Sequence, residues 1–494
     1  MLSQFALLIL GFFSQRAMNL YMGAELVGMN GVISNVINIL SVTELGISTA
    51  IVYHLYGALA RKDEAEIASL MNLYRKAYHV FAVLVFAAGM AVLPFIHLFM
   101  KNNSYSLSYI RVLYAMWLVR TVLSYLLTYR KSLLIADQKE YIASITGLIL
   151  NVVSYLAIIL LVTWEQNYLL ALGIGTVTEV VLNIWISWYV EQKYPFLRQR
   201  RKEKSTSSLT KRIVRDLKSL FISRISEKML YCTDNLIISG FIGVGTVGRY
   251  ANYCMITQAI SNILTILANT IQPTVGDYFT EKNRQRNYEI LRQLTFGFFC
   301  IASVVSVGLF SLITPFVRDI WLGPSYELGL GITVFCIVVL LVRIMGLPLS
   351  LVMGVTGLFE KEKNVGASSA LLNLIVSLAL VKPYGMAGVL LGTLLSYLLQ
   401  ILYRYIIYFR DFLEMPGEAL RYAQDIGEYL AVIAGEVLLM QKIVPLIYGA
   451  GGMLLFCVCF LLCIAIPLLL DLVIFGRGWR LQSIVTMVKG MRKA

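Results

Sequence analysis

The stretch Ile337-Val-Val-Leu-Leu-Val-Arg343-Ile-Met-Gly-Leu-Pro348 lies within an apolar run, residues 328–357, in which Arg343 is the one charged side chain. A helix needs roughly 20 apolar residues to cross the hydrocarbon core of a bilayer. The run is long enough for this. A charge at its middle is costly unless it faces a polar cavity or a partner. The stretch therefore predicts a membrane-spanning helix that carries a functional arginine.

Similar apolar runs recur along the whole chain. We expect about 14 membrane-spanning helices, near 4–23, 27–57, 77–99, 108–129, 142–163, 168–190, 219–242, 247–275, 293–314, 328–357, 365–381, 387–409, 427–446 and 450–475. In lipid, backbone groups must pair within the protein, and runs of this length do so as helices. The sequence therefore predicts an all-α, polytopic membrane protein.

The composition agrees with this fold class. Of the 494 residues, 58% are hydrophobic and 14% are charged, whereas soluble domains average about 25% charged residues. The seven cysteines show no disulfide spacing, and we expect Cys457, Cys459 and Cys463 to be buried within one apolar run. No small-residue cleavage site follows the first apolar run, so we expect that run to stay in the mature protein.

Lysine and arginine are distributed unevenly over the connectors. With the N-terminus inside, the inner connectors and the tail hold 30 of these residues, and the outer connectors hold 5. Cytoplasmic connectors carry the excess of positive charge in membrane proteins, so we expect both termini in the cytoplasm. The net charge of +14 follows from the same bias. Because no aromatic platform accompanies it, it predicts no nucleic-acid partner.

The two halves of the chain resemble each other. Val27-Gly28 recurs as Val247-Gly248 at an offset of 220, and Gly175-Thr176 recurs as Gly392-Thr393 at an offset of 217. Six spans per repeat is an even number, so both copies enter the membrane in the same direction. We therefore expect the repeats to be related by an axis along the membrane normal, with a cavity between two lobes.

This duplication predicts the domain organisation. We expect an N-terminal six-helix lobe (1–191), a basic cytoplasmic linker (192–218), a second six-helix lobe (219–409), a cytoplasmic connector (410–426), two additional helices (427–475) and a basic cytoplasmic tail (476–494). At the 220-residue offset Met1 aligns with Phe221, inside the seventh run. The first helix is therefore expected to lack the lead-in of its counterpart.

Gly243-Val-Gly245-Thr-Val-Gly248 fits the G-x-G-x-x-G pattern of dinucleotide-binding proteins. That pattern has meaning only between a strand and a helix. Here it joins two apolar runs, so we interpret it as a tight glycine turn. The sequence has no Walker motif, zinc-ligand spacing or nucleophile elbow, and its three histidines are isolated. We therefore expect no enzyme activity, no cofactor and no metal site.

Several charged residues lie inside the apolar runs. Guanidinium groups bind phosphate oxygens bidentately and stay protonated, so we expect the arginines to bind an anionic ligand. We expect the carboxylates to serve in ion or proton coupling. The arginine candidates are Arg16, Arg120, Arg224, Arg249 and Arg343, and the acidic candidates are Glu44, Glu179 and Asp234.

Structural alternatives stay open for some of these charges. Arg16 and Arg249 can extend to the outer interface, and Arg224 to the inner one. Polar side chains from Arg224 to Asp234 recur every three or four residues on one helix face, where they can form an ion-pair ladder that serves packing alone. Glu436 lies outside the repeats, and we interpret it as a structural or peripheral group.

Four stretches carry a family resemblance: Met22-Gly-Ala-Glu-Leu-Val-Gly-Met-Asn-Gly31, Thr43-Glu-Leu-Gly-Ile-Ser-Thr-Ala-Ile51, Leu70-Met-Asn-Leu-Tyr-Arg-Lys-Ala-Tyr78 and Thr233-Asp-Asn-Leu-Ile-Ile-Ser239. With them, and in layout over essentially its whole length, the chain resembles the polysaccharide-export, oligosaccharide-lipid flippase branch of the multidrug/oligosaccharidyl-lipid/polysaccharide exporter superfamily. The short N-terminus departs from the family pattern.

The resemblance implies a flippase of the bacterial cytoplasmic membrane that moves a polyprenyl-pyrophosphate oligosaccharide to the outer leaflet for surface-polysaccharide assembly. Arg16, Arg224 and Arg343 are then expected to hold the head group, with Arg120 and Arg249 as further candidates. The prenyl tail stays in lipid while the lobes rock. The implied partners are the lipid-linked oligosaccharide, membrane lipids, and the polymerase and glycosyltransferases of the pathway.

Two other functions stay open. A cation-coupled multidrug exporter shares the superfamily architecture, but it predicts acidic cavity residues instead of arginines. A membrane-embedded glycosyltransferase or polymerase would need a large outer loop with catalytic residues, and the outer connectors of this sequence are all short.

Overall fold

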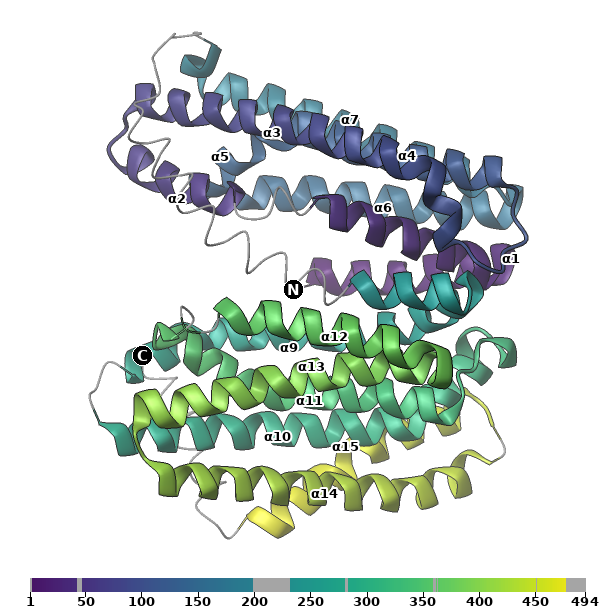
Figure 1. The fold of residues 1–494 in the computed structure, drawn as a ribbon, viewed down its shortest axis with the longest axis vertical. Coiled ribbons are helices and arrows are strands. Elements are labelled where there is room, and N and C mark those ends of the chain that lie inside the picture. Colours follow the sequence, from purple (N-terminus) through teal and green to yellow (C-terminus); the bar gives the residue numbers. More distant parts are fainter. Residues whose placement is uncertain are drawn as a thin grey trace. The chain divides into compact units, whose positions relative to one another are not determined.

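The structure is a computed structural model of the 494-residue chain, and it describes residues 2–41, 47–198, 232–279, 283–358, 361, 363–449 and 451–476. These residues are mostly helical, and none of them lies in a β-strand. The chain folds into two compact units, an N-terminal unit (Met1–Gly248) and a C-terminal unit (Arg249–Ala494). The all-α fold class predicted from the sequence is confirmed (Figure 1).

The N-terminal unit is built from long helices joined by short connectors. In chain order its elements are α1 (Leu2–Leu40), α2 (Ile47–Ala60), α3 (Glu64–Val92), η2 (Leu93–Phe99), α4 (Leu107–Thr128), α5 (Lys131–Ala136), α6 (Glu140–Glu165), α7 (Tyr168–Lys193) and η3 (Pro195–Arg198). Residues 232–241 form a further helical segment. Helix α7 packs against α4 and α6, and α1 packs against α6.

The C-terminal unit continues the helical pattern. Helix α9 (Val244–Tyr278) begins in the first unit, and α10 (Arg284–Pro315), η4 (Phe316–Trp321), η5 (Pro324–Tyr326), α11 (Leu330–Val355), α12 (Lys363–Tyr384), α13 (Met386–Ile406), η7 (Ile407–Leu413), α14 (Pro416–Tyr448) and α15 (Met453–Phe475) follow. Helix α10 packs against α11, α14 and α15. It forms the core of this unit.

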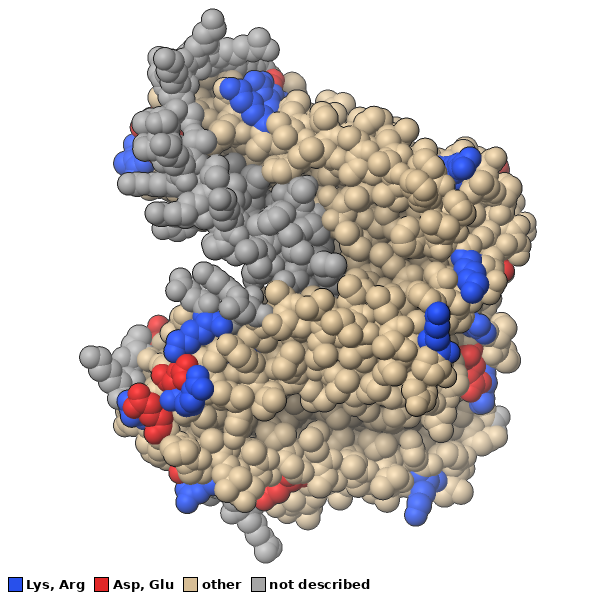
Figure 2. All heavy atoms as spheres, viewed as in Figure 1, with Lys and Arg blue, Asp and Glu red and all other residues tan. Residues whose placement is uncertain are grey.

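Eleven helices in the described part of the chain are long and apolar enough to cross a membrane. Large apolar side chains stay exposed on them; Trp164 is 80% exposed and Leu454 is 78% exposed. In each unit, the surface between the charged helix ends is broad and uncharged (Figure 2). Such a surface suits lipid and not water, so the protein is a multi-pass membrane protein.

Three helices begin well before the apolar runs that predicted them. Helices α3, α10 and α14 start at Glu64, Arg284 and Pro416, whereas the runs were placed at 77–99, 293–314 and 427–446. Their first turns are polar and their later turns are apolar. Hydropathy therefore located the part of each helix that suits lipid, whereas the start of a helix depends on its cap. The side chains of Asp63 and Asn283 cap α3 and α10: each accepts a hydrogen bond from the backbone N–H three residues later, that of Glu66 and of Arg286.

The first two predicted spans are organised differently from the expectation. Helix α1 includes both 4–23 and the first part of 27–57, and it bends at Gly23, whose φ of 82° lies in the left-handed region. Glycine takes this conformation without the clash that a Cβ would cause. The rest of the second predicted span is α2, and residues 42–46 between them are outside the described residues.

The G-x-G-x-x-G motif forms a turn and a close helix crossing. Gly243 has a φ of 141° and precedes the first residue of α9. A Cβ on Gly248 would overlap the carbonyl oxygen of Ala24 in α1, and a Cβ on Gly28 would overlap that of Val244. Gly243 and Gly248 are thus explained by backbone geometry, as the sequence interpretation of a glycine turn expected.

Candidate functional site

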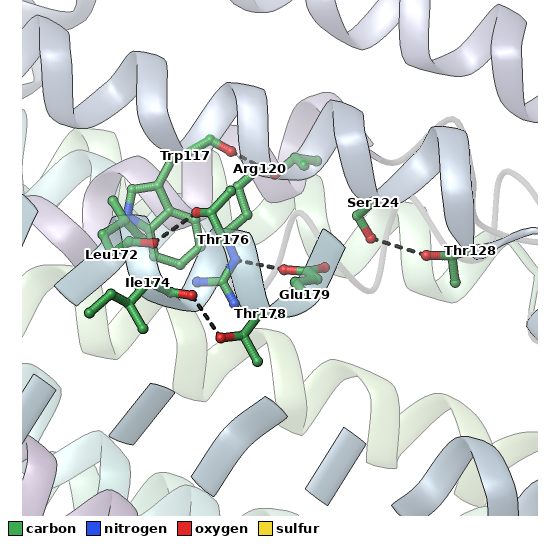
Figure 3. Close-up of polar contacts among 10 residues, drawn as sticks. Trp117, Arg120, Ser124, Thr128, Leu172, Ile174, Thr176, Thr178 and Glu179 are labelled. Atoms are coloured by element: carbon green, nitrogen blue, oxygen red, sulfur yellow. Dashed lines mark hydrogen bonds and ion pairs between the residues drawn. The ribbon is translucent and has the colours of Figure 1, made fainter. Parts of the chain in front are cut away.

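An ion pair joins α4 and α7 inside the N-terminal unit. The Nε of Arg120 donates to Oε2 of Glu179 at 2.7 Å, and the two side chains point toward each other (Figure 3). Both side chains are largely buried, with 21% and 17% of their surface exposed. Two of the residues selected from the sequence, one as a ligand-binding arginine and one as a coupling carboxylate, are therefore direct partners.

Aromatic and amide side chains support this arginine. Trp117 lies one helical turn before Arg120, and its ring centroid is 5.4 Å from the guanidinium carbon. The Nε1 of Trp117 and the hydroxyl of Tyr168 both donate to Oδ1 of Asn30, at 2.7 and 2.9 Å. Helices α1, α4 and α7 are thereby joined around one amide oxygen, which fixes the face of α4 that carries Arg120.

Glycine at position 175 leaves room for the guanidinium. A Cβ there would lie 3.5 Å from Nη1 of Arg120 and 3.1 Å from Oγ of Ser154. The repeated Gly175-Thr176 motif thus contains a position where α7 closely approaches both the arginine and α6. The hydroxyls of Thr176 and Thr178 donate to carbonyl oxygens of their own helix.

A groove of about 580 Å³ lies on the same helices. Its lining is mainly apolar and comes almost entirely from α7, with Met116 contributed by α4: Met116, Asn167, Leu169, Leu170, Gly173, Ile174, Val177 and Thr178. Thr178 is the chain neighbour of Glu179, and Met116 precedes Trp117. The apolar groove therefore lies on the two helices that carry the ion pair, although neither Arg120 nor Glu179 lines it.

The second half of the chain carries a related arginine. Leu118-Val-Arg120 in α4 recurs as Leu341-Val-Arg343 in α11, at an offset of 223. Arg343 is half-buried, and its guanidinium lies 5.5 Å from the ring centroid of Tyr397 in α13. The α4–α7 and α11–α13 pairs both pack together. Each unit therefore directs one arginine from the first helix of such a pair toward the second.

The remaining predicted site residues lie on other elements. Arg16 is exposed on α1, Arg249 is half-buried near the start of α9, and Asp234 is buried in the helical segment 232–241. Glu44 and Arg224 lie outside the described residues. Among the residues that are described, no group of three or more His, Cys, Asp and Glu side chains could hold a metal ion.

Sequence reasoning missed Asn30, Trp117 and Tyr168. Two signals were present. Trp117 lies three residues before Arg120, a spacing that puts both on one helix face, and Asn30 is a polar residue within an apolar run. Neither signal predicts that Asn30 and Trp117 bond to each other, because the two residues are 87 positions apart in sequence.

The fold is similar to those of solved membrane transporters. The chain matches the inward closed conformation of the lipid II flippase MurJ with a TM-score of 0.68 and 16% identity, over 96% of this chain and 98% of that one. It matches the inward-facing conformation of a multidrug resistance MATE family transporter with a TM-score of 0.66 and 13% identity, over 83% and 94%. A Vibrio cholerae MATE transporter, VcmN, matches with a TM-score of 0.52 and 10% identity, over 83% and 96%.

Sequence comparison gives the family. No curated protein matches the chain. The family model described as "Polysaccharide biosynthesis protein" matches residues 1–279, which is more than half of the chain. The resemblance noted in the sequence is thereby confirmed: the chain belongs to the polysaccharide biosynthesis protein family.

Proposed function

We propose that the protein is a flippase that moves a polyprenyl-pyrophosphate-linked oligosaccharide from the cytoplasmic to the outer leaflet for surface-polysaccharide biosynthesis. The observation that carries the proposal is the Arg120–Glu179 pair, held at 2.7 Å between two membrane-spanning helices that also line an apolar groove. Membership of the polysaccharide biosynthesis family supports the proposal, and so does the fold shared with a lipid II flippase.

The arginine suits the head group of such a lipid. A guanidinium presents about five N–H donors in a planar fork, and that fork matches two phosphate oxygens at once. A pyrophosphate that competes with Glu179 for Arg120 leaves the carboxylate without its counter-ion. Glu179 then takes up a proton or a cation, and release of the lipid restores the pair. This exchange links substrate binding to ion coupling at one point.

The groove suits the tail. Its lining, from Met116 and the exposed face of α7, is apolar and so suits a prenyl chain. The same two helices carry Arg120, which is proposed to hold the head group. An amphiphile with an anionic head and a long apolar tail therefore matches both parts of the site. A small hydrophilic sugar would match neither.

The other candidate charges extend this mechanism. Arg343 occupies the related position in the second half, and Arg16, Arg224 and Arg249 are proposed as further contacts for the head group. Glu44 and Asp234 are proposed to share the coupling role with Glu179. Translocation follows from rocking of the two halves about the bound head, the usual mode for transporters built from repeats.

The test uses the full-length protein in a strain that lacks its own copy, with surface-polysaccharide output and membrane abundance measured together. Arg120→Leu leaves Glu179 buried without a partner, which destabilises the protein. The double variant Arg120→Leu, Glu179→Leu removes both charges and should restore abundance. Output from the double variant should still fall at least roughly tenfold, as expected when a transport step loses a charge-assisted contact.

A matched control is a second ion pair within the same unit. Arg130 and Glu191 form an ion pair at 2.5 Å, also between the α4 side and α7. Arg130→Leu, Glu191→Leu should keep wild-type output at matched abundance. Wild-type output from the Arg120–Glu179 double variant would contradict the proposal. Loss of dye efflux, without change in polysaccharide, would indicate the multidrug exporter instead.

A further inference from the structure

Two buried carboxylates lie among the helices of the C-terminal unit, away from the pair described above. Glu436 in α14 is 3% exposed and Asp471 in α15 is 4% exposed. Both helices pack against α10 and against each other. The two carboxylates are close enough to interact electrostatically, and both lie near Ser303 of α10.

The carboxylate oxygens are poorly satisfied. The hydroxyl of Ser303 donates its single hydrogen to Oε2 of Glu436 at 2.6 Å, so it cannot donate to Asp471 at the same time. Oε1 of Glu436 and both oxygens of Asp471 are buried, and none has a hydrogen-bond partner among the described residues. Native proteins rarely leave three such acceptors unpaired.

A second contact between α10 and α14 shows that Glu436 lacks a positively charged partner of the kind another acid on α14 has. Eleven residues earlier on each helix, Nε of Arg292 donates to Oδ2 of Asp425 at 2.6 Å. Eleven residues make about three helical turns, so the two contacts lie on one face of the α10–α14 interface. In one contact the buried acid Asp425 has Arg292 opposite it, and in the other Glu436 has Ser303 opposite it.

The groups around the acidic pair supply no positive charge in the part of the chain that the structure describes. On α10 the titratable neighbour is the thiol of Cys300, which interacts with both acids. On one side the rings of Phe299, Tyr429 and Phe475 close the interface; Phe299 and Tyr429 stack with centroids 4.4 Å apart. Two adjacent negative charges in such surroundings cannot both persist.

We propose that Glu436 and Asp471 form a proton-binding site, in which the pair holds at least one proton in the folded protein and exchanges it during transport. A protonated carboxyl donates to its neighbour, so one proton pairs two of the three oxygens that are otherwise unpaired. A divalent cation would need about six oxygen ligands, more than the two acids and one serine provide. The exchange during transport rests on the proposed flippase function, whereas the protonation itself does not.

The site also gives a role to α14 and α15, which lie outside the two repeats predicted from the sequence. Proton release charges two neighbouring acids in an apolar setting, so it favours a conformation in which α15 moves away from α14 or water enters. Such a pair biases a two-state equilibrium according to its protonation. Glu436, interpreted from the sequence as structural or peripheral, is therefore proposed as part of the coupling machinery.

Infrared difference spectroscopy tests the protonation directly. Purified full-length protein in a detergent without ester groups should show the C=O stretching band of a protonated carboxylic acid at neutral pH. Glu436→Gln and Asp471→Asn should each change this band, and the double variant should remove it. Ser303→Ala should shift the band, because it removes the hydrogen bond to Glu436. Asp425→Asn is the control and should leave the band intact, because Asp425 is paired with Arg292.

Three results would overturn the site: no such band in the wild-type protein, a band unchanged in both single variants, or a band removed by sodium at constant pH, which would mean a metal ion. Coupling has a separate measurement. In proteoliposomes that contain a polyprenyl-pyrophosphate oligosaccharide, Glu436→Gln should flatten the pH dependence of translocation, and an unchanged dependence would refute the coupling. If the wild-type protein moves no such lipid, the proposed function fails while the spectroscopic result stands.

Discussion

At the scale of single residues, three half-buried arginines have different neighbours. Arg120 is matched by a carboxylate at 2.7 Å and Arg292 by another at 2.6 Å, whereas Arg343 lies over the ring of Tyr397. An aromatic face attracts a guanidinium without neutralising it. The substrate-binding role given to Arg343 from the sequence stays a prediction.

Substitution of Arg343 should separate charge from shape. Arg343→Lys keeps the charge but loses the planar fork and its stacking on Tyr397, so polysaccharide output should fall while membrane abundance survives. Arg343→Leu should reduce output further. The control Tyr397→Phe keeps the aromatic face and should leave output near the wild-type level, whereas Tyr397→Leu should destabilise the protein by about 1 kcal/mol. Full output from Arg343→Leu at matched abundance would show that this arginine does not handle the substrate.

At the scale of helices, the α1–α9 crossing depends on two glycines from corresponding positions in the repeats. Gly28 approaches the carbonyl of Val244, and Gly248 approaches the carbonyl of Ala24. Gly248 lies 220 residues after Gly28, and Val244 lies 220 residues after Ala24. Each glycine therefore contacts the residue of the other repeat that lies four positions before its own counterpart. A twofold relation between the repeats would produce this reciprocity, and the relation itself stays a prediction.

The crossing should tolerate no side chain at either glycine. In Gly248→Ala the new Cβ overlaps backbone, which can move only with its helix, so the free energy of unfolding should fall by roughly 1–3 kcal/mol. Gly28→Ala should behave alike. Gly245→Ala is the matched control within the same motif, because its Cβ would lie at an ordinary 3.7 Å from the Glu25 side chain. Thermal unfolding in detergent measures all three, and equal stability of Gly248→Ala and Gly245→Ala would disprove the close crossing.

At the scale of the whole molecule, orientation in the membrane follows from the charge bias of the connectors. The linker 192–218 should be cytoplasmic, and the glycine turn at 243–248 should lie outside. Single cysteines at Ser207 and Thr246, in a background without the exposed Cys457, can be labelled with a reagent that does not cross membranes. Ser207→Cys should react only after the cells are opened, and Thr246→Cys should react in intact cells. External labelling of Ser207→Cys would reverse the topology.

The sequence by itself located the apolar part of most of the membrane-spanning helices that the structure describes. Hydropathy is a local property, so runs such as 142–163 and 168–190 predicted α6 and α7 closely. It missed α5, a helix of six residues that is too short to cross a bilayer. The candidate charges could also be named from the sequence, because a charge within an apolar run is costly wherever it lies.

Only the tertiary structure decided which charges meet. Arg120 and Glu179 are 59 residues apart, and Glu436 meets a serine 133 residues away. Such partners depend on how far each helix is rotated about its axis and where it crosses its neighbours. Those two quantities follow from the packing of all the side chains together, not from the residues next to each charge. This is why two independently chosen candidates became one ion pair, and why Glu436, interpreted as a structural or peripheral group, was found buried beside a second acid.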